Sequence, residues 1–154
     1  MNARSLEGPS CVVRAHAIEE GLVRLHARNQ AWSAEGQLSF APSAVHPSAL
    51  DYLLGALASD LVAGLAREAA REGHALDAIE LNLGGDLENP LVPLGVVGEE
   101  GHARLTRVTG SLYVRTEIDV PALRNLWERV LDKAPVFGTL SGNVTIDITL
   151  KPVP

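Results

Sequence analysis

The sequence predicts an α+β fold in a single domain covering residues 1–154. Two helices are expected: a long apolar one over Tyr52–Ala66 and an amphipathic one that follows Asp119. Alternating segments before, between and after them predict strands. Because the strands form runs instead of alternating one by one with helices, an α+β class is favoured over a parallel α/β fold. A chain of 154 residues most economically forms one domain, with residues 1–9 as a frayed tail.

The first two strands are predicted at Val12–Ile18 and Leu22–Arg28, with Glu19-Glu20-Gly21 as the hairpin turn. If paired residues sum to an even number, the apolar odd-numbered side chains share one face. The other face then carries Arg14, His16, Arg24, His26 and Arg28. A polar strand face usually points to water. The functional alternative is that this face binds an anion or a carboxylate.

The long helix is apolar or small at every position of Tyr52–Ala66 except Asp60. It is expected to start at His46 or Pro47 and to end near Gly73. A helix that is apolar on all sides must be surrounded by protein. One small sheet and one further helix are too little to cover it, so we expect a second copy of the chain, in an obligate homodimer.

Asp60 is the informative residue of this helix, because Asp is rarely buried without a partner. Three environments stay open for it: a wet seam, an arginine partner or a functional site. We favour an ion pair with an arginine of the N-terminal hairpin.

The rest of the chain alternates strands, a loop and the amphipathic helix. The expected strands are Trp32–Phe40, Leu76–Leu83, Arg104–Ile118 with a bend at Gly110, and Asn143–Lys151. Gly84–Gly101 reads as a loop, and it lacks the Gly-Lys-Ser/Thr ending of a phosphate loop. Asp119 caps the amphipathic helix, which stops at Ala134-Pro135.

Composition excludes several classes. The net charge of −6 argues against a general nucleic-acid binder. The apolar run is shorter than a membrane span and carries a carboxylate, so no membrane association is expected. The single cysteine, Cys11, excludes an intrachain disulfide and any two-thiol mechanism within one chain.

No signal peptide is recognised, and we expect a cytoplasmic protein without a cofactor. No metal site is expected either, since the histidines are scattered and there is no cysteine cluster.

Three stretches resemble the OsmC/Ohr family of osmotically induced and organic hydroperoxide resistance proteins. His46–Ser59 is similar to the family's Pro-x-x-Leu-Leu-x-Ala-Leu-Ala-x-Cys helix, and Val120–Lys133 to its second helix. Ala134–Leu140 resembles its Cys-Pro-Val segment. The resemblance runs from about Cys11 to Lys151, with the stretches in the family's order and spacing.

This resemblance implies an OsmC-like fold in which antiparallel sheets surround a long buried central helix and a second amphipathic helix. It also implies an intertwined homodimer with active sites at the subunit interface, where two cysteines reduce organic hydroperoxides. Here Asp60 stands at the position of the peroxide-attacking cysteine and Ala134 at that of the resolving cysteine. Asp51 is the residue nearest to the family's site glutamate. The family's site arginine corresponds to one of Arg14, Arg24 and Arg28.

Cysteine-based peroxidase activity is therefore predicted to be absent, because a carboxylate cannot replace a thiolate in peroxide reduction. The favoured hypothesis is a homodimer whose interface pocket binds a small hydrophobic or anionic molecule. The pocket candidates are Asp51, Ser59, His46, Arg14, Arg24 and Arg28. One alternative is an enzyme that uses Asp60 with a nearby His or Arg for acid–base or hydrolytic chemistry. The other is a purely structural relative.

Overall fold

The computed structural model describes residues 11–19, 21–36, 38 and 43–153. The chain forms two compact units, Met1–Ala49 and Leu50–Pro154. The single-domain organisation stays a prediction, and the expected tail over residues 1–9 lies outside the described residues.

The first unit holds a three-stranded antiparallel sheet of β1 (Arg14–Glu19), β2 (Leu22–Ala27) and β3 (Gln30–Glu35), in that order. Arg14 pairs with His26 and His16 with Arg24. This is the even-sum register that the sequence predicts. Four residues of the predicted polar face therefore share one side of the sheet, and we call them the basic face: Arg14, His16, Arg24 and His26.

Arg28 does not belong to the basic face, contrary to the prediction. The chain reverses at Arg28 and Asn29, so Ala27 already pairs with Gln30. Arg28 has a φ of 52°, a left-handed turn conformation that is uncommon for a residue with a side chain. Because the reversal comes early, β3 starts at Gln30 and ends at Glu35 instead of running from Trp32 to Phe40. Residues 37 and 39–42 lie outside the described part of the chain.

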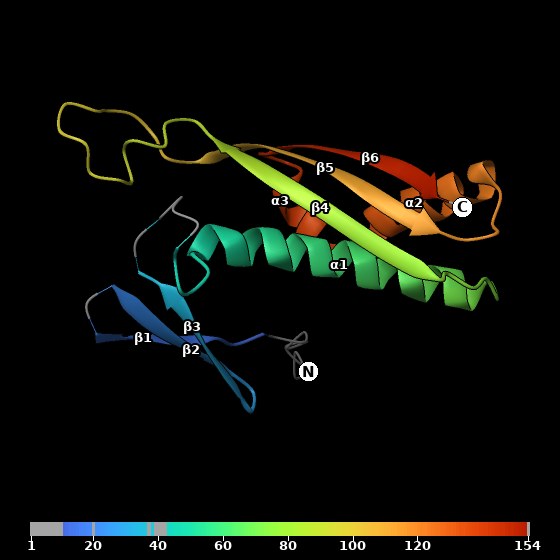
Figure 1. Ribbon diagram of the computed structural model, residues 1–154, viewed down its shortest axis with the longest axis horizontal. Coiled ribbons are helices and arrows are strands. Elements are labelled where there is room, and N and C mark those ends of the chain that lie inside the picture. Colours follow the sequence, from blue (N-terminus) through green and yellow to red (C-terminus); the bar gives the residue numbers. More distant parts are fainter. Residues whose placement is uncertain (1–10, 20, 37, 39–42, 154) are drawn as a thin grey trace, which may run out of the picture. The chain divides into compact units, whose positions relative to one another are not determined.

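The second unit has one sheet with three helices (Figure 1). Its elements are α1 (Ala49–Arg71), β4 (Ala78–Leu87), β5 (Leu105–Arg115), α2 (Val120–Lys133), α3 (Pro135–Leu140) and β6 (Thr145–Val153). The α+β class is confirmed. One detail differs: β6 runs parallel to β5, so the sheet is mixed and not purely antiparallel. The two helices between β5 and β6 provide the crossover that parallel neighbours need.

One face of the β4–β5–β6 sheet carries the core of the second unit. Val108, Leu112 and Val114 of β5 are fully buried there. Both long helices pack onto this face, α1 with Leu57, Leu61, Leu65 and Ala69, and α2 with Leu123, Leu126, Trp127 and Val130. The helical spacing of the leucines explains why α1 presents one continuous apolar stripe to the sheet.

Glycines in the sheet mark close approaches of the chain. The sequence prediction placed a loop from Gly84 onward, but β4 continues through Gly84 and Gly85 to Leu87. A Cβ on Gly85 would lie 2.7 Å from a methyl carbon of Leu105, and one on Gly110 would lie 2.3 Å from the backbone oxygen of Asn82. Packing therefore requires glycine at Gly110, where the neighbour is backbone, whereas at Gly85 the Leu105 side chain would have to shift.

The outer side of α1 is not covered within the single chain, where its small residues Gly55, Ala56, Ser59, Ala63 and Ala66 are exposed. The sequence analysis expects a second copy of the chain to cover this side, and that cover stays a prediction. The helix is long and apolar enough to cross a membrane by length and composition alone. Its leucine stripe nevertheless packs against the sheet, and this arrangement is typical of a core helix in a soluble protein.

The second predicted helix is confirmed in its start. The carboxylate of Asp119 accepts a hydrogen bond from the backbone N–H of Ala122 at 2.8 Å, which makes Asp119 the N-cap of α2. The helix also ends where predicted, with Lys133 as its last residue and Ala134 as its C-cap. Pro135 then opens a further short helix, α3, which the sequence analysis did not predict, at the first helical position that proline favours.

Candidate functional site

Asp60 holds the N-terminus of α3. One of its carboxylate oxygens accepts hydrogen bonds from the backbone N–H groups of Val136, at 2.9 Å, and Phe137, at 3.4 Å. Ala134, the N-cap residue of α3, has no side-chain acceptor of its own. The first N–H groups of a helix have no partner within the helix, so an acceptor must come from elsewhere. Asp60 supplies it from α1, across 76 residues of sequence.

The remaining donors of this first turn are also accounted for. Pro135 has no N–H, and the N–H of Gly138 bonds to the backbone oxygen of Ala134 at 2.9 Å. Asp60 therefore completes the hydrogen bonding of the α3 N-terminus. A carboxylate is also the charge that a helix N-terminus favours. Asp60 thus serves a helix end, a role that the sequence analysis did not consider.

Asp60 and Ala134 line the same small cavity, as expected if they occupy the two cysteine positions of the resembled family. The cavity measures about 20 Å³ and is lined by Asp60, Gly64, Arg67, Glu68, Val130, Lys133 and Ala134. A volume of this size corresponds to about one water molecule. Ala134 is buried and offers only a methyl group.

A second carboxylate in this cavity, Glu68, was missed by the sequence analysis. Glu68 is buried and accepts hydrogen bonds from Lys133 at 2.9 Å and from Arg71 at 2.7 Å. The hydrogen bond from Lys133 lowers the pKa of Glu68 below its ordinary value, against the opposing effect of burial. The bond from Lys133 ties α1 to the end of α2, and the bond from Arg71 lies within α1. The position of Glu68 eight residues after Asp60, on the same helical face, is the signal that could have identified it.

The close crossing of α1 and α2 beside the cavity depends on Gly64. A Cβ at this position would lie 2.8 Å from a methyl carbon of Val130. The crossing leaves little free space between the helices, which explains why the cavity is so small.

The other predicted pocket residues of α1 are on its outer side. Ser59 is exposed, and its hydroxyl donates to the backbone oxygen of Ala56 at 3.1 Å. Asp51 is exposed in the first turn of α1. Neither lines the cavity that contains Asp60.

The remaining candidates belong to the first unit. The backbone N–H of His46 donates to the Glu35 carboxylate at 3.2 Å. Arg14 and Arg24 lie on the basic face, and Arg28 lies in the β2–β3 turn. An ion pair between one of these arginines and Asp60 would join the two units, and it stays a prediction.

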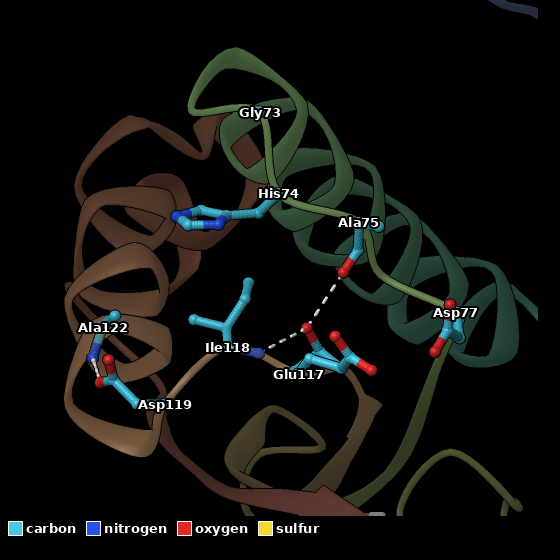
Figure 2. A pocket seen from close by; sticks show the side chains of 9 residues that line it. Gly73, His74, Ala75, Asp77, Glu117, Ile118, Asp119 and Ala122 are labelled. Atoms are coloured by element: carbon cyan, nitrogen blue, oxygen red, sulfur yellow. Dashed lines mark hydrogen bonds between the residues drawn. The ribbon is translucent and has the colours of Figure 1, made fainter.

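A larger hollow of about 490 Å³ lies at the far end of α1, where two connections meet (Figure 2). The connection that follows α1 contributes Gly73, His74, Ala75 and Asp77. The connection that precedes α2 contributes Thr116, Glu117, Ile118 and Asp119, and the first turn of α2 contributes Ala122. The Thr116 hydroxyl donates to the backbone oxygen of Ala75 at 3.0 Å and accepts from the N–H of Ile118 at 3.2 Å. Thr116 therefore ties the two connections together, and Asp119 is occupied as the helix cap.

Metal binding was not expected from the sequence. In the part of the chain that the structure describes, no three His, Cys, Asp or Glu side chains are grouped as ligands of a metal ion would be. The absence of a metal site remains a prediction.

Comparison with known proteins identifies the fold. No family model matches the chain, and no curated protein matches it. Among solved structures, an OsmC-like protein from Mycoplasma pneumoniae is similar with a TM-score of 0.79 and 15% identity, over 95% of this chain and 99% of that one. An OsmC-like protein of unknown function from Vibrio cholerae has a TM-score of 0.75 and 9% identity, over 93% and 99%.

The organic hydroperoxide resistance proteins are similar as well. The protein from Bacillus subtilis has a TM-score of 0.63 and 14% identity, over 92% of this chain and 98% of its own. At such identities the likeness is one of fold, and it covers nearly the whole length of each chain. The chain therefore has the OsmC-like fold that its sequence resemblance to the OsmC/Ohr family implies.

Proposed function

We propose that this protein is a stress-response relative of the OsmC/Ohr proteins that does not reduce hydroperoxides, and that it binds a small hydrophobic or anionic molecule as a homodimer. The observation that carries the proposal is the arrangement of Asp60 and Ala134. The two residues line one cavity, as two cooperating cysteines would. Ala134, however, offers only a methyl group, and the carboxylate of Asp60 already accepts hydrogen bonds from two backbone N–H groups.

The chemistry of peroxide reduction supports the loss of activity. A thiolate must attack the peroxide oxygen, and a second thiol must then resolve the sulfenic acid. The chain has a single cysteine, Cys11, which is exposed near the N-terminus and matches neither family position. One thiol per chain cannot complete this cycle within the chain.

The dimer and the location are parts of the same proposal. The exposed small residues of α1 leave room for a second copy of this helix, and the resembled family implies a site between subunits. A lone cysteine is compatible with a reducing compartment, which supports a cytoplasmic location.

The test is a hydroperoxide assay. The purified protein is incubated with cumene or tert-butyl hydroperoxide and dithiothreitol, and peroxide consumption is compared with that of buffer and of the Cys11→Ser variant. We expect the three rates to be equal, because no thiol pair is available. Consumption that the Cys11→Ser change abolishes would show that Cys11 is catalytic. Consumption that survives the change would reveal another reducing group. Either result would overturn the proposal.

A further inference from the structure

The basic face of the first unit gathers four nitrogen-rich side chains on two neighbouring strands. In the register of β1 and β2, Arg14 lies directly opposite His26, and His16 lies directly opposite Arg24. Directly opposite residues of antiparallel strands have Cα atoms about 5 Å apart. The two pairs are two residues apart along the strands, about 7 Å. The four groups thus stand at the corners of one small patch.

The two histidines of the basic face are in contact. Their rings are stacked, with centroids 5.3 Å apart and planes inclined by 11°. An arginine lies across the strands from each ring. Like charges opposite each other on a sheet are unfavourable, so this arrangement has an electrostatic cost when nothing is bound.

The positively charged neighbours of His26 affect its pKa. Burial, followed by the charges of Arg14, His16 and Arg24, lowers the pKa of His26 below its ordinary value. On the neighbouring strand β3, Ala31 lies opposite His26 and Ser33 lies opposite Arg24. Glu35 lies two residues beyond Ser33, and its carboxylate accepts a hydrogen bond from the backbone N–H of His46. Among the side chains that the structure describes, no carboxylate forms an ion pair with a member of the basic face. Glu19 pairs with Leu22 at the end of β1, and its side chain lies outside the described part of the chain.

We propose that the basic face is a binding site for a small anion with two linked phosphate groups. Arginine offers a planar fork of donors that suits phosphate oxygens, and the imidazole N–H groups add further donors, which become charge-assisted when a bound anion favours the protonated ring. A patch of about 5 by 7 Å can engage both groups of a diphosphate at once. The arginines exclude a cation between the histidines. The net charge of −6 for the whole chain disfavours a long polyanion, so the ligand is small.

This site lies entirely on one sheet, so it requires neither the dimer nor the interface pocket of the proposed function. Binding also has a consequence for protonation. An anion beside His26 favours its charged form, so the pKa of His26 rises when the ligand binds.

The experiment is an NMR titration of the full-length labelled protein with inorganic pyrophosphate at pH 7 and constant ionic strength. We expect saturable shifts of the basic-face resonances and a higher pKa of His26 at saturation. Arg24→Gln should weaken binding about fivefold or more, because it removes a bidentate contact. The matched control is Arg28→Gln, which removes the same charge from the turn, off the basic face, and should change the dissociation constant less than about twofold in physiological salt.

The inference would be overturned by shifts that do not saturate, by shifts centred elsewhere in the chain, or by an equal loss of affinity in the two variants. Both substitutions are at accessible surface positions, and a dispersed spectrum of each variant confirms that it is folded. An equal response to sulfate at matched ionic strength would show a general anion effect, and would also reject a site for linked phosphates.

Discussion

Replacing Gly110 by alanine is expected to destabilise the protein by at least about 3 kcal/mol, beyond the usual range of overpacking. Gly110 lies in β5, the central strand of its sheet, opposite Leu83 of β4. A Cβ there would lie 2.3 Å from the backbone oxygen of Asn82 and 2.5 Å from a methyl carbon of Leu83. Backbone cannot rotate away as a side chain can, so the strands would have to separate.

The control for this prediction is Gly84→Ala. Gly84 lies in β4 of the same sheet, but a Cβ added there would meet no atom within 4 Å. We expect the free energy of unfolding of this variant to stay within about 1 kcal/mol of the wild type. Urea titration of the two variants measures the difference. Equal stability of both would contradict the close approach at Gly110.

Replacing Ala63 by arginine is expected to abolish the proposed homodimer. Ala63 is exposed on the outer side of α1, among small residues that would lie against the second copy of the helix. A charge buried there without a partner costs roughly 3 kcal/mol or more, about a hundredfold or more in the dissociation constant. Sedimentation equilibrium at micromolar concentration should therefore show a single chain or a loss of folded protein.

Ala103→Arg is the matched control, because it introduces the same side chain at an exposed position outside α1. This variant should sediment like the wild type, as a dimer. A wild type that is a well-folded monomer would contradict the homodimer directly. A dimeric Ala63→Arg variant would show that the outer side of α1 is not the interface.

Periodicity along the chain predicted much of the fold. The apolar spacing of Leu57, Leu61 and Leu65 identified the central helix. The turn at Glu19-Glu20-Gly21 predicted the hairpin of β1 and β2, and the parity of their side chains agreed with the even-sum register that the structure has. In both features the residues that interact are close together in the sequence, so the spacing of apolar side chains along the chain predicts them directly. The cap of α2 at Asp119 was also found, because capping residues have a sequence signature.

The errors came from contacts between distant parts of the chain. Gly84 and Gly85 suggest a loop when read alone, but β5 pairs with them and extends β4. The helix α3 has only 6 residues, too few for a periodic pattern, and its first turn depends on Asp60 far away in sequence. The parallel direction of β6 depends on the connection through α2 and α3, which leads the chain from the end of β5 back to the start of β6. No local pattern contains this information.

The candidate site was predicted in part. The two aligned positions, Asp60 and Ala134, do lie together, and the resemblance to a family with cooperating cysteines implied this. The partner of Asp60 was not found, since backbone N–H groups leave no mark in the sequence. Glu68 was overlooked because a glutamate in the last third of a helix looks like a solvent-facing residue, whereas Lys133 and Arg71 neutralise it in a buried position.

Asp60 acts as a structural hydrogen-bond acceptor for α3 and not as a reactive group. Urea titration at pH 7 of Asp60→Asn, Asp60→Ala and the neighbouring control Ser59→Ala tests this most directly. Asparagine keeps an acceptor oxygen, so Asp60→Asn should cost less than about 1 kcal/mol, whereas Asp60→Ala should cost about 1 to 2 kcal/mol, as loss of a helix cap does. Ser59→Ala, on the exposed side of α1, should stay within about 0.5 kcal/mol of the wild type. Equal losses of roughly 3 to 5 kcal/mol for Asn and Ala would instead indicate a buried ion pair with an arginine, and an Asp60→Ala variant as stable as the wild type would show that α3 does not depend on Asp60.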